Sequence, residues 1–138
     1  MTTQYKYKSL REQIAAETKE RKERYEFYEQ VVIEAHFEAH EAVKQYTPTP
    51  MCVTDGKTNW VIEDGVCGFA EVRLPKGNTS FARWAKKNTA FDKHYGGGLS
   101  LWVSDYNQSM ERKEVYARTY ANVLNRHGID AYATSRMD

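Results

Sequence analysis

The stretch YGGGLSLWVSDYNQS, residues 95–109, decides much of the fold. Its three glycines lead into the apolar run Leu99–Asp105, which predicts a strand, and the polar residues 106–109 open a helix that runs to Gly128. A strand, a polar turn and a helix N-terminus in this order form a corner that can hold an anion, because the first N–H groups of a helix have no partner inside it. We call residues 105–112 the polar corner.

The polar corner holds five candidate ligand-binding residues: Asp105, Asn107, Gln108, Ser109 and Arg112. They bring donors and a cation to the edge at which open α/β sheets usually bind ligands. In the alternative interpretation, Ser109 only caps the helix and Arg112 only pairs with Asp105. The preceding glycines come before their strand, whereas phosphate-binding loops follow one. They predict a flexible strand entry, a close approach of the backbone to a neighbouring segment, or a lid over the polar corner.

Upstream of this stretch, two Asp-Gly turns divide residues 51–74 into three β-rich runs, 51–54, 59–63 and 66–74. Asp-Gly between such runs is a strong hairpin signal, so the segment predicts an antiparallel meander of three strands. A short helix over residues 80–87 follows, capped by Asn78 or Thr79, and residues 129–134 predict a closing strand. Because two helices each connect two strands, we expect two β-α-β crossovers in a mixed sheet.

Residues 9–47 predict one long N-terminal helix. Ser9 and Glu12 form a capping box, and no Gly or Pro interrupts residues 10–47. Such a helix spans on the order of 55 Å, whereas a compact domain of this size is roughly 35 Å wide. Part of the helix must therefore project or pair.

The two halves of this helix differ in character. The first half has no apolar face and carries favourable i, i+4 charge pairs, Glu17 with Arg21 and Glu20 with Arg24. The second half has an apolar stripe that must dock on the rest of the chain, with small Ala side chains that allow close approach. The stripe contains residues 25, 28, 32, 35, 39, 42 and 46, widened by Phe27, Val31 and Phe37.

Charge is balanced overall, at +1, but residues 72–95 carry six Lys/Arg against one Asp/Glu. Within this basic stretch, Arg83, Lys86 and Lys87 face outward from the short helix, and they are candidate ligand-binding residues for an anion. Nearby aromatic residues, including Phe91, could stack on a base, so single-stranded nucleic acid is an open alternative. A merely solvated basic face explains the same charges.

Composition places the chain among ordinary globular proteins, at 41% hydrophobic and 28% charged residues. No apolar run approaches the ~20 residues that cross a bilayer, and the N-terminus lacks the apolar core of a signal peptide, so we expect a cytoplasmic protein without a membrane partner. Cys52 and Cys67 are too few for a disulfide scaffold and are expected to be buried, reduced thiols.

Two further groups of residues are weak candidates for a metal site and for a catalytic site. His36 and His40 lie one helical turn apart, but a metal site needs three or four ligands and no other His-rich segment exists, so we expect no metal or cofactor. Cys67, His94 and Asp105 could form a nucleophile, base and orienting group, although nothing in their spacing requires it. We expect no catalytic residue here.

Four segments carry a resemblance: GVCGFA at 65–70, YGGG at 95–98, WVSDYNQS at 102–109 and AYATSRMD at 131–138. In them the chain resembles small uncharacterised proteins of tailed bacteriophages, over roughly residues 60–138. The resemblance implies an accessory protein made inside the host during infection that binds a host component or a host-made signal. It supplies no site residues.

Together these patterns predict an α+β fold with a mixed sheet, in which residues 1–50 form a long helical arm and residues 51–138 the α+β core. The arm is expected to mediate homo-oligomerisation or partner binding. We expect a small oligomeric binding protein that engages an anionic, nucleotide-like ligand or a host protein. The alternatives are an enzyme acting on a nucleotide or phosphorylated substrate, and a structural assembly protein.

Overall fold

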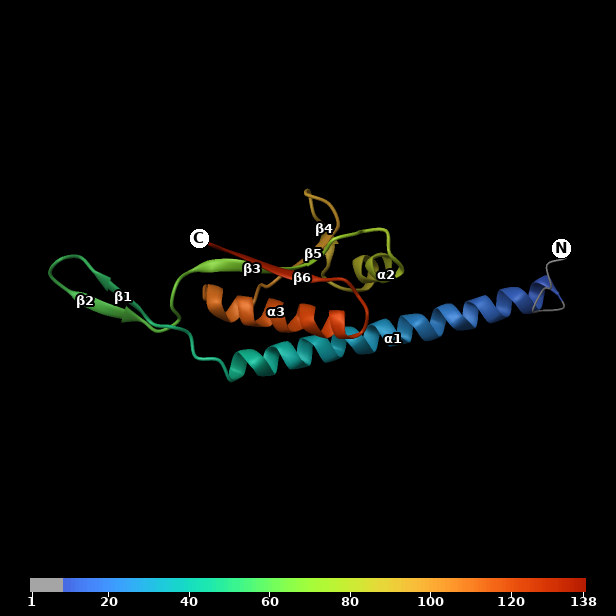
Figure 1. Cartoon of the computed structure of the whole chain (residues 1–138), viewed down its shortest axis with the longest axis horizontal. Helices are drawn as coiled ribbons and strands as arrows, with labels where there is room; N and C mark the ends of the chain where they lie inside the picture. Colours follow the sequence, from blue (N-terminus) through green and yellow to red (C-terminus); the bar gives the residue numbers. More distant parts are fainter. Residues whose placement is uncertain (1–8) are drawn as a thin grey trace.

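The computed structural model describes residues 9–138, which form an α+β fold led by a long helix (Figure 1). The helices are α1 (Leu10–Lys44), α2 (Ser80–Asn88) and α3 (Met110–Arg126). The strands are β1 (Met51–Thr54), β2 (Asn59–Ile62), β3 (Gly68–Leu74), β4 (Asp92–Lys93), β5 (Leu99–Trp102) and β6 (Tyr132–Met137).

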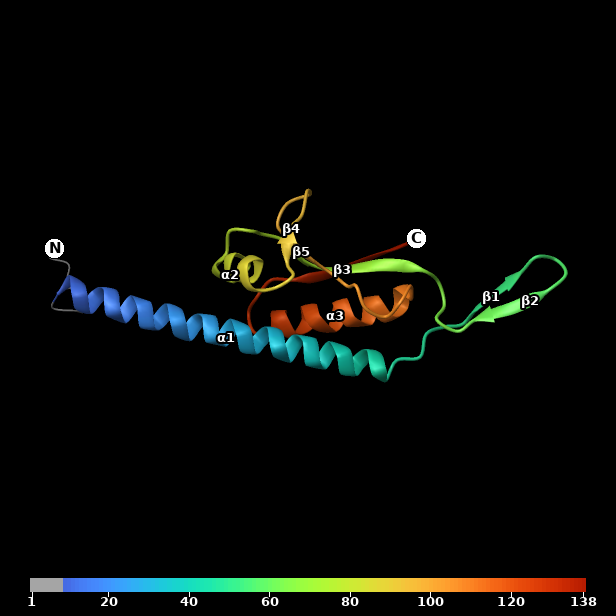
Figure 2. The same ribbon diagram turned by 180° about the vertical axis from the view of Figure 1, so that it is seen from behind.

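Helix α1 forms as predicted, in one unbroken piece. The Ser9 side chain accepts a hydrogen bond from the Glu12 N–H at 3.2 Å, and the helix ends at Lys44, before Pro48. Its first half extends beyond the body of the molecule, and its second half lies alongside α3 in both views (Figures 1 and 2). The expectation of a projecting helix is confirmed.

The docked half of α1 buries one residue per turn: Val31, Ala35, Ala39 and Val43. Steps of four residues keep these side chains on one face, and the two Ala residues are fully buried, which lets the helices approach closely. Phe37 was expected to widen this stripe, but it lies on the opposite face and is 64% exposed. That part of the prediction is wrong.

Polar contacts join the end of α3 to the middle of α1. Arg126 forms ion pairs with Glu34 and Glu38, and His127 Nε2 lies 2.8 Å from Glu34 Oε2. The hydrogen bonds from His127 and Arg126 lower the pKa of the Glu34 carboxyl. Helix α3 ends as predicted at Gly128, whose φ is +80°, in a Schellman motif. Ion pairs therefore stabilise the interface between α1 and α3 in addition to its packed side chains.

Strand β3 is central to a four-stranded sheet with the order β4-β5-β3-β6, and every neighbouring pair is antiparallel. Because β5 and β6 are both antiparallel to β3, they run parallel to each other and α3 makes the expected crossover. The expected crossover through α2 is wrong. Leu99, the first residue of β5, pairs with Leu74, the last residue of β3. The connection through α2 and β4 therefore brings the chain back to the same end of β3, and β5 runs antiparallel beside it.

The expected three-stranded meander is also wrong. Strands β1 and β2 pair with each other around Asp55-Gly56, but they form a separate two-stranded sheet that projects from the body (Figure 1). All four residues of β2 are at least partly exposed, whereas β3 alternates buried and half-buried side chains. β3 therefore pairs with strands that share its buried face.

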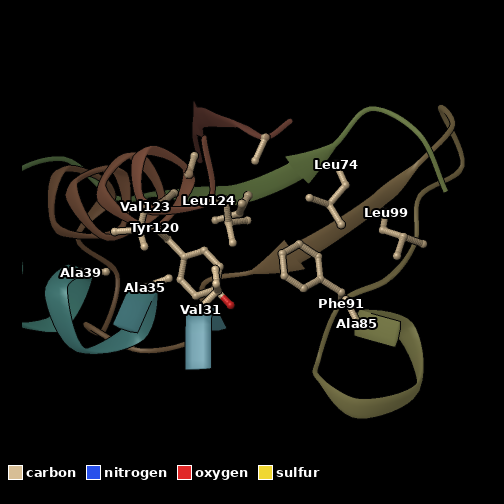
Figure 3. Close-up of a cluster of buried hydrophobic side chains, with 14 of the residues drawn as sticks. Val31, Ala35, Ala39, Leu74, Ala85, Phe91, Leu99, Tyr120, Val123 and Leu124 are labelled. Atoms are coloured by element: carbon tan, nitrogen blue, oxygen red, sulfur yellow. The ribbon is translucent and has the colours of Figure 1, made fainter. Parts of the chain in front are cut away.

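The core lies between the sheet and the helices, and Figure 3 shows Phe91, Tyr120 and Leu124 within it. Both cysteines are exposed, so their predicted burial is wrong. Cys67 lies just before β3, where its only β-bridge is to Ser109. No helix formed by residues 9–138 has the length and apolar character needed to cross a membrane.

Candidate functional site

The polar corner is built as predicted but is already occupied by the chain itself. Ser109 is 1% exposed; its hydroxyl donates to the Asp64 carbonyl at 2.9 Å and accepts from the Arg112 N–H at 3.3 Å. The Met110 N–H donates to the Val66 carbonyl at 3.1 Å. Residues 64–68 therefore cover the N-terminus of α3 and use donors that an anion would need.

The other residues of the polar corner are more accessible. Asp105, Asn107 and Gln108 are exposed, and Asn107 has a φ of +55°. Arg112 pairs with Asp64 at 3.4 Å and not with Asp105, and its Nε is buried without a partner among residues 9–138. The N-cap interpretation of Ser109 is thus confirmed, with a different ion-pair partner for Arg112.

The outward cations of α2 form a second candidate site together with α1. A groove of about 870 Å³ separates the two helices, and we call it the basic groove. Arg83, Lys86 and Lys87 line it from α2, as expected for the outward face of that helix. Its lining from α1 is Arg21, Arg24 and Tyr25, and Gly77, Ser80, Trp84 and Asn88 complete it.

Five cations therefore converge on one groove from two helices that are about sixty residues apart in the chain. None of the five forms an ion pair with a residue of the described part of the chain. The Arg24 guanidinium lies 6.0 Å from the ring centre of Tyr25. The unneutralised positive charge favours an anion in the groove.

The i, i+4 pairs expected on α1, Glu17 with Arg21 and Glu20 with Arg24, do not form. Sequence reasoning assigned both arginines to a solvated helix and so missed their place in the groove. No local signal distinguishes the two cases, because the charge pattern of α1 is the same whether or not α2 lies beside it.

The predicted site residues thus fall into two separate places. The polar corner lies at the N-terminal end of α3, whereas α2, which carries the cations, lies near the C-terminal end of α3 (Figure 1). The structure does not bring the polar corner and the cations of α2 into one site. Of the two places, the basic groove has the more available charged groups.

The histidines of α1 contact a tyrosine of α3 and a tyrosine of the loop that precedes α3. His36 Nδ1 lies 2.6 Å from the Tyr116 hydroxyl, and His40 Nδ1 lies 2.8 Å from that of Tyr106. Burial raises the pKa of both tyrosine hydroxyls, and the nearby Asp105 carboxylate raises both pKa values further. No group of three or more metal-ligating side chains exists among residues 9–138.

Cys67, His94 and Asp105 are not assembled into a catalytic set. His94 lies 3.6 Å from Glu71, and no hydrogen bond or ion pair joins any two of the three within the described chain. No protein-family model, no curated protein and no solved structure matches this chain.

Proposed function

We propose that this chain is a small accessory binding protein that holds an anionic, phosphate-bearing ligand in the basic groove. One observation carries the proposal: five cations from α1 and α2 line the same groove, and none pairs with a described carboxylate. Cations brought together without neutralisation repel one another, and a bound phosphate relieves that repulsion.

The size and lining of the groove support a ligand larger than an inorganic ion. A volume of about 870 Å³ is in the range of small-molecule sites. Tyr25 and Trp84 add aromatic surface between the cations. The described lining has no carboxylate, imidazole or thiol that could act as a base or activate the Ser80 hydroxyl. This favours binding over the alternative of an enzyme that acts on a nucleotide.

The charge of the basic groove can be tested with the double variant Lys86→Glu, Lys87→Glu. Both side chains are exposed, so the fold should persist while affinity for inorganic triphosphate falls at least about tenfold. Binding is measured by isothermal titration calorimetry at several salt concentrations. For a short oligothymidylate, the slope of log K against log salt should become shallower by about 0.7 for each phosphate that the variant no longer neutralises.

The matched control is Lys44→Glu, Lys57→Glu, which makes the same change in net charge at exposed positions outside the groove. It should leave triphosphate affinity nearly unchanged. Equal affinity of the wild-type protein and the Lys86, Lys87 variant would remove the proposal. Much tighter binding of oligothymidylate than of triphosphate would assign nucleic acid as the ligand.

We further propose that α1 mediates self-association, the role expected for the N-terminal arm. Two pairs of exposed apolar side chains, each one helical turn apart, support this: Leu10 with Ile14, at 71% and 54% exposure, and Ile33 with Phe37, at 61% and 64%. Exposed apolar pairs on one helix are candidates for contact with a second copy.

Serine at both positions of a pair should lower the mass of the protein in solution. We expect light scattering to show a multiple of the chain mass for the wild type and a lower multiple for Leu10→Ser, Ile14→Ser or Ile33→Ser, Phe37→Ser. Ala15→Ser, at an exposed position on the same helix, is the control. A wild-type protein with the mass of one chain contradicts the proposal. Assembly without anion binding would instead favour a structural role.

The resemblance to phage proteins leads us to propose that the chain acts in the cytoplasm of an infected host. The exposed thiols of Cys52 and Cys67 support a reducing compartment, in which such thiols persist unpaired. A host protein with an acidic surface is an alternative occupant of the basic groove.

A further inference from the structure

One face of the four-stranded sheet is not covered by any helix of residues 9–138. Helices α1 and α3 lie on one side of the sheet (Figures 1 and 2), and Ala70, Val72 and Leu74 of β3 are buried toward them. The alternate residues Phe69, Glu71 and Arg73 are half-buried and point to the opposite face. This face presents charged and aromatic side chains that the packing of the core does not require.

Strand register determines which side chains meet on the open face, because paired residues share one side of a sheet. Glu71 lies between Trp102 of β5 and Thr134 of β6. Arg136 pairs with Phe69, and its guanidinium lies 5.5 Å from that ring. Together with the loop residues His94 and Tyr95, these side chains line a cleft of about 410 Å³, which we call the sheet-face cleft.

Two aromatic side chains offer exposed ring surface in the sheet-face cleft. Trp102 is 47% exposed, and one side of it packs against Phe69 at a ring-centre distance of 5.2 Å. Tyr95, from the glycine-rich loop, is 98% exposed and stacks on His94 at 4.7 Å. Exposed rings on a sheet face are platforms on which a flat heterocycle can stack.

Glu71 provides a hydrogen-bond acceptor beside this platform. Its Oε1 accepts from the Thr134 hydroxyl at 3.3 Å and lies 3.6 Å from His94 Nε2 and 3.8 Å from Arg73 Nη1. Within residues 9–138, Oε2 has no hydrogen-bond partner. An ionised carboxylate accepts and never donates, so it selects ligands by their N–H groups.

Cations flank the same carboxylate. Arg73 donates from Nη2 to the Gly97 carbonyl at 2.9 Å, but its Nε is buried and has no partner in the described chain. Arg136 is exposed and forms no ion pair there. A phosphate that follows a stacked base would find both guanidinium groups within the sheet-face cleft.

We propose that the sheet-face cleft binds the guanine base of a nucleotide, stacked on Trp102 and hydrogen-bonded to Glu71. Guanine presents two adjacent N–H donors on its Watson–Crick edge, which match the two oxygens of a carboxylate. Adenine, cytosine and uracil each place an acceptor beside the donor, and this acceptor repels the carboxylate. The phosphate lies against Arg73 and Arg136.

The site shares no residue with the basic groove, so it stands independently of the proposed function.

The test is a titration of the full-length protein with GMP, AMP, CMP and UMP, in which calorimetry and tryptophan fluorescence measure the affinity for each nucleotide. GMP should bind about tenfold or more tighter than the other three. Glu71→Gln keeps the shape of the side chain but places an amide donor against the base, so the preference for GMP should disappear. Trp102→Ala should weaken all nucleotides, and circular dichroism checks that each variant is folded.

Trp60→Phe is the matched control, because Trp60 is also about half exposed, at 44%, but lies on β2 outside the cleft. It should leave every affinity unchanged. A T-G-T trinucleotide that binds more tightly than GMP would assign the guanine to a single strand, and the reverse would assign a free nucleotide. Equal affinity for all four nucleotides, no detectable binding, or a GMP preference that survives Glu71→Gln overturns the proposal.

Discussion

Replacing Phe91 with alanine is expected to lower the free energy of unfolding by about 3–5 kcal/mol. The ring is 1% exposed and makes edge contacts with Phe81 of α2 and Tyr120 of α3, at ring-centre distances of 6.4 and 6.1 Å. Figure 3 shows it between Leu99 of β5 and Tyr120. Alanine would leave a cavity where α2, α3 and the sheet meet, and each element would lose packing at once.

Urea denaturation monitored by circular dichroism measures the effect, and an unchanged m-value would show that the folded state keeps its compactness. Tyr95→Ala is the control. It removes an aromatic ring from the same loop region, but from a side chain that is 98% exposed, so it should change stability by no more than about 0.5 kcal/mol. Similar losses for the two variants would show that Phe91 does not hold the core together.

The second large effect is expected from Gly98→Ala, with a loss of about 2–5 kcal/mol. Gly98 has a φ of +68°, which costs an L-residue about 1–2 kcal/mol. A Cβ at this position would also lie 2.0 Å from the Leu74 carbonyl oxygen and 2.9 Å from Pro75 backbone atoms. Relieving that overlap separates the entry of β5 from the end of β3, at a further cost of about 1–3 kcal/mol.

Gly97→Ala separates the two causes. Gly97 also has a positive φ, +102°, but nothing lies within 4 Å of a Cβ built on it. The Gly97→Ala variant should therefore lose only the stability that the positive φ costs, about 1–2 kcal/mol. Chemical denaturation of both variants gives the difference directly, and equal losses would contradict a role for the close approach of β5 to β3.

Gly98 also bears on the sheet-face cleft. The loop that it closes presents Tyr95, and the Gly97 carbonyl in that loop accepts a hydrogen bond from Arg73. The sequence predicts a flexible strand entry or a close approach of the backbone to a neighbour at residues 96–98. The close approach is confirmed at Gly98, where a Cβ would lie 2.0 Å from the Leu74 carbonyl oxygen. The structure shows a defined turn, in which the His94 N–H donates to the Gly98 carbonyl at 3.0 Å. The glycines are needed for backbone geometry and for the tight fit against Leu74.

The helices could be predicted because their signals are local. Ser9, Thr79 and Ser109 each accept from a backbone N–H three residues later, and Gly128 ends α3 with a positive φ. Each of these interactions depends on residues within one turn, so it is encoded in a few neighbouring positions. The outward direction of the α2 cations follows from the same short-range periodicity.

The candidate sites could not be predicted in the same way. Arg21 and Arg24 become part of the basic groove only because α2 lies beside α1. Phe91, considered as a ring that could stack on a base, is instead buried in the core. The cleft between Trp102 and Glu71 depends on β5 pairing with β3, which joins residues about thirty positions apart in the chain.

The sequence by itself therefore determined the helices, their caps and the β1–β2 hairpin, because nearest neighbours along the chain decide these features. It also determined the projection of α1, because a helix of that length exceeds the width of a compact domain. Only the tertiary structure decided the strand order, the covering of the polar corner by residues 64–68, and the two surfaces that bring charged and aromatic groups together. Those outcomes depend on contacts between segments tens of residues apart, and a residue pattern does not specify which distant face it will meet.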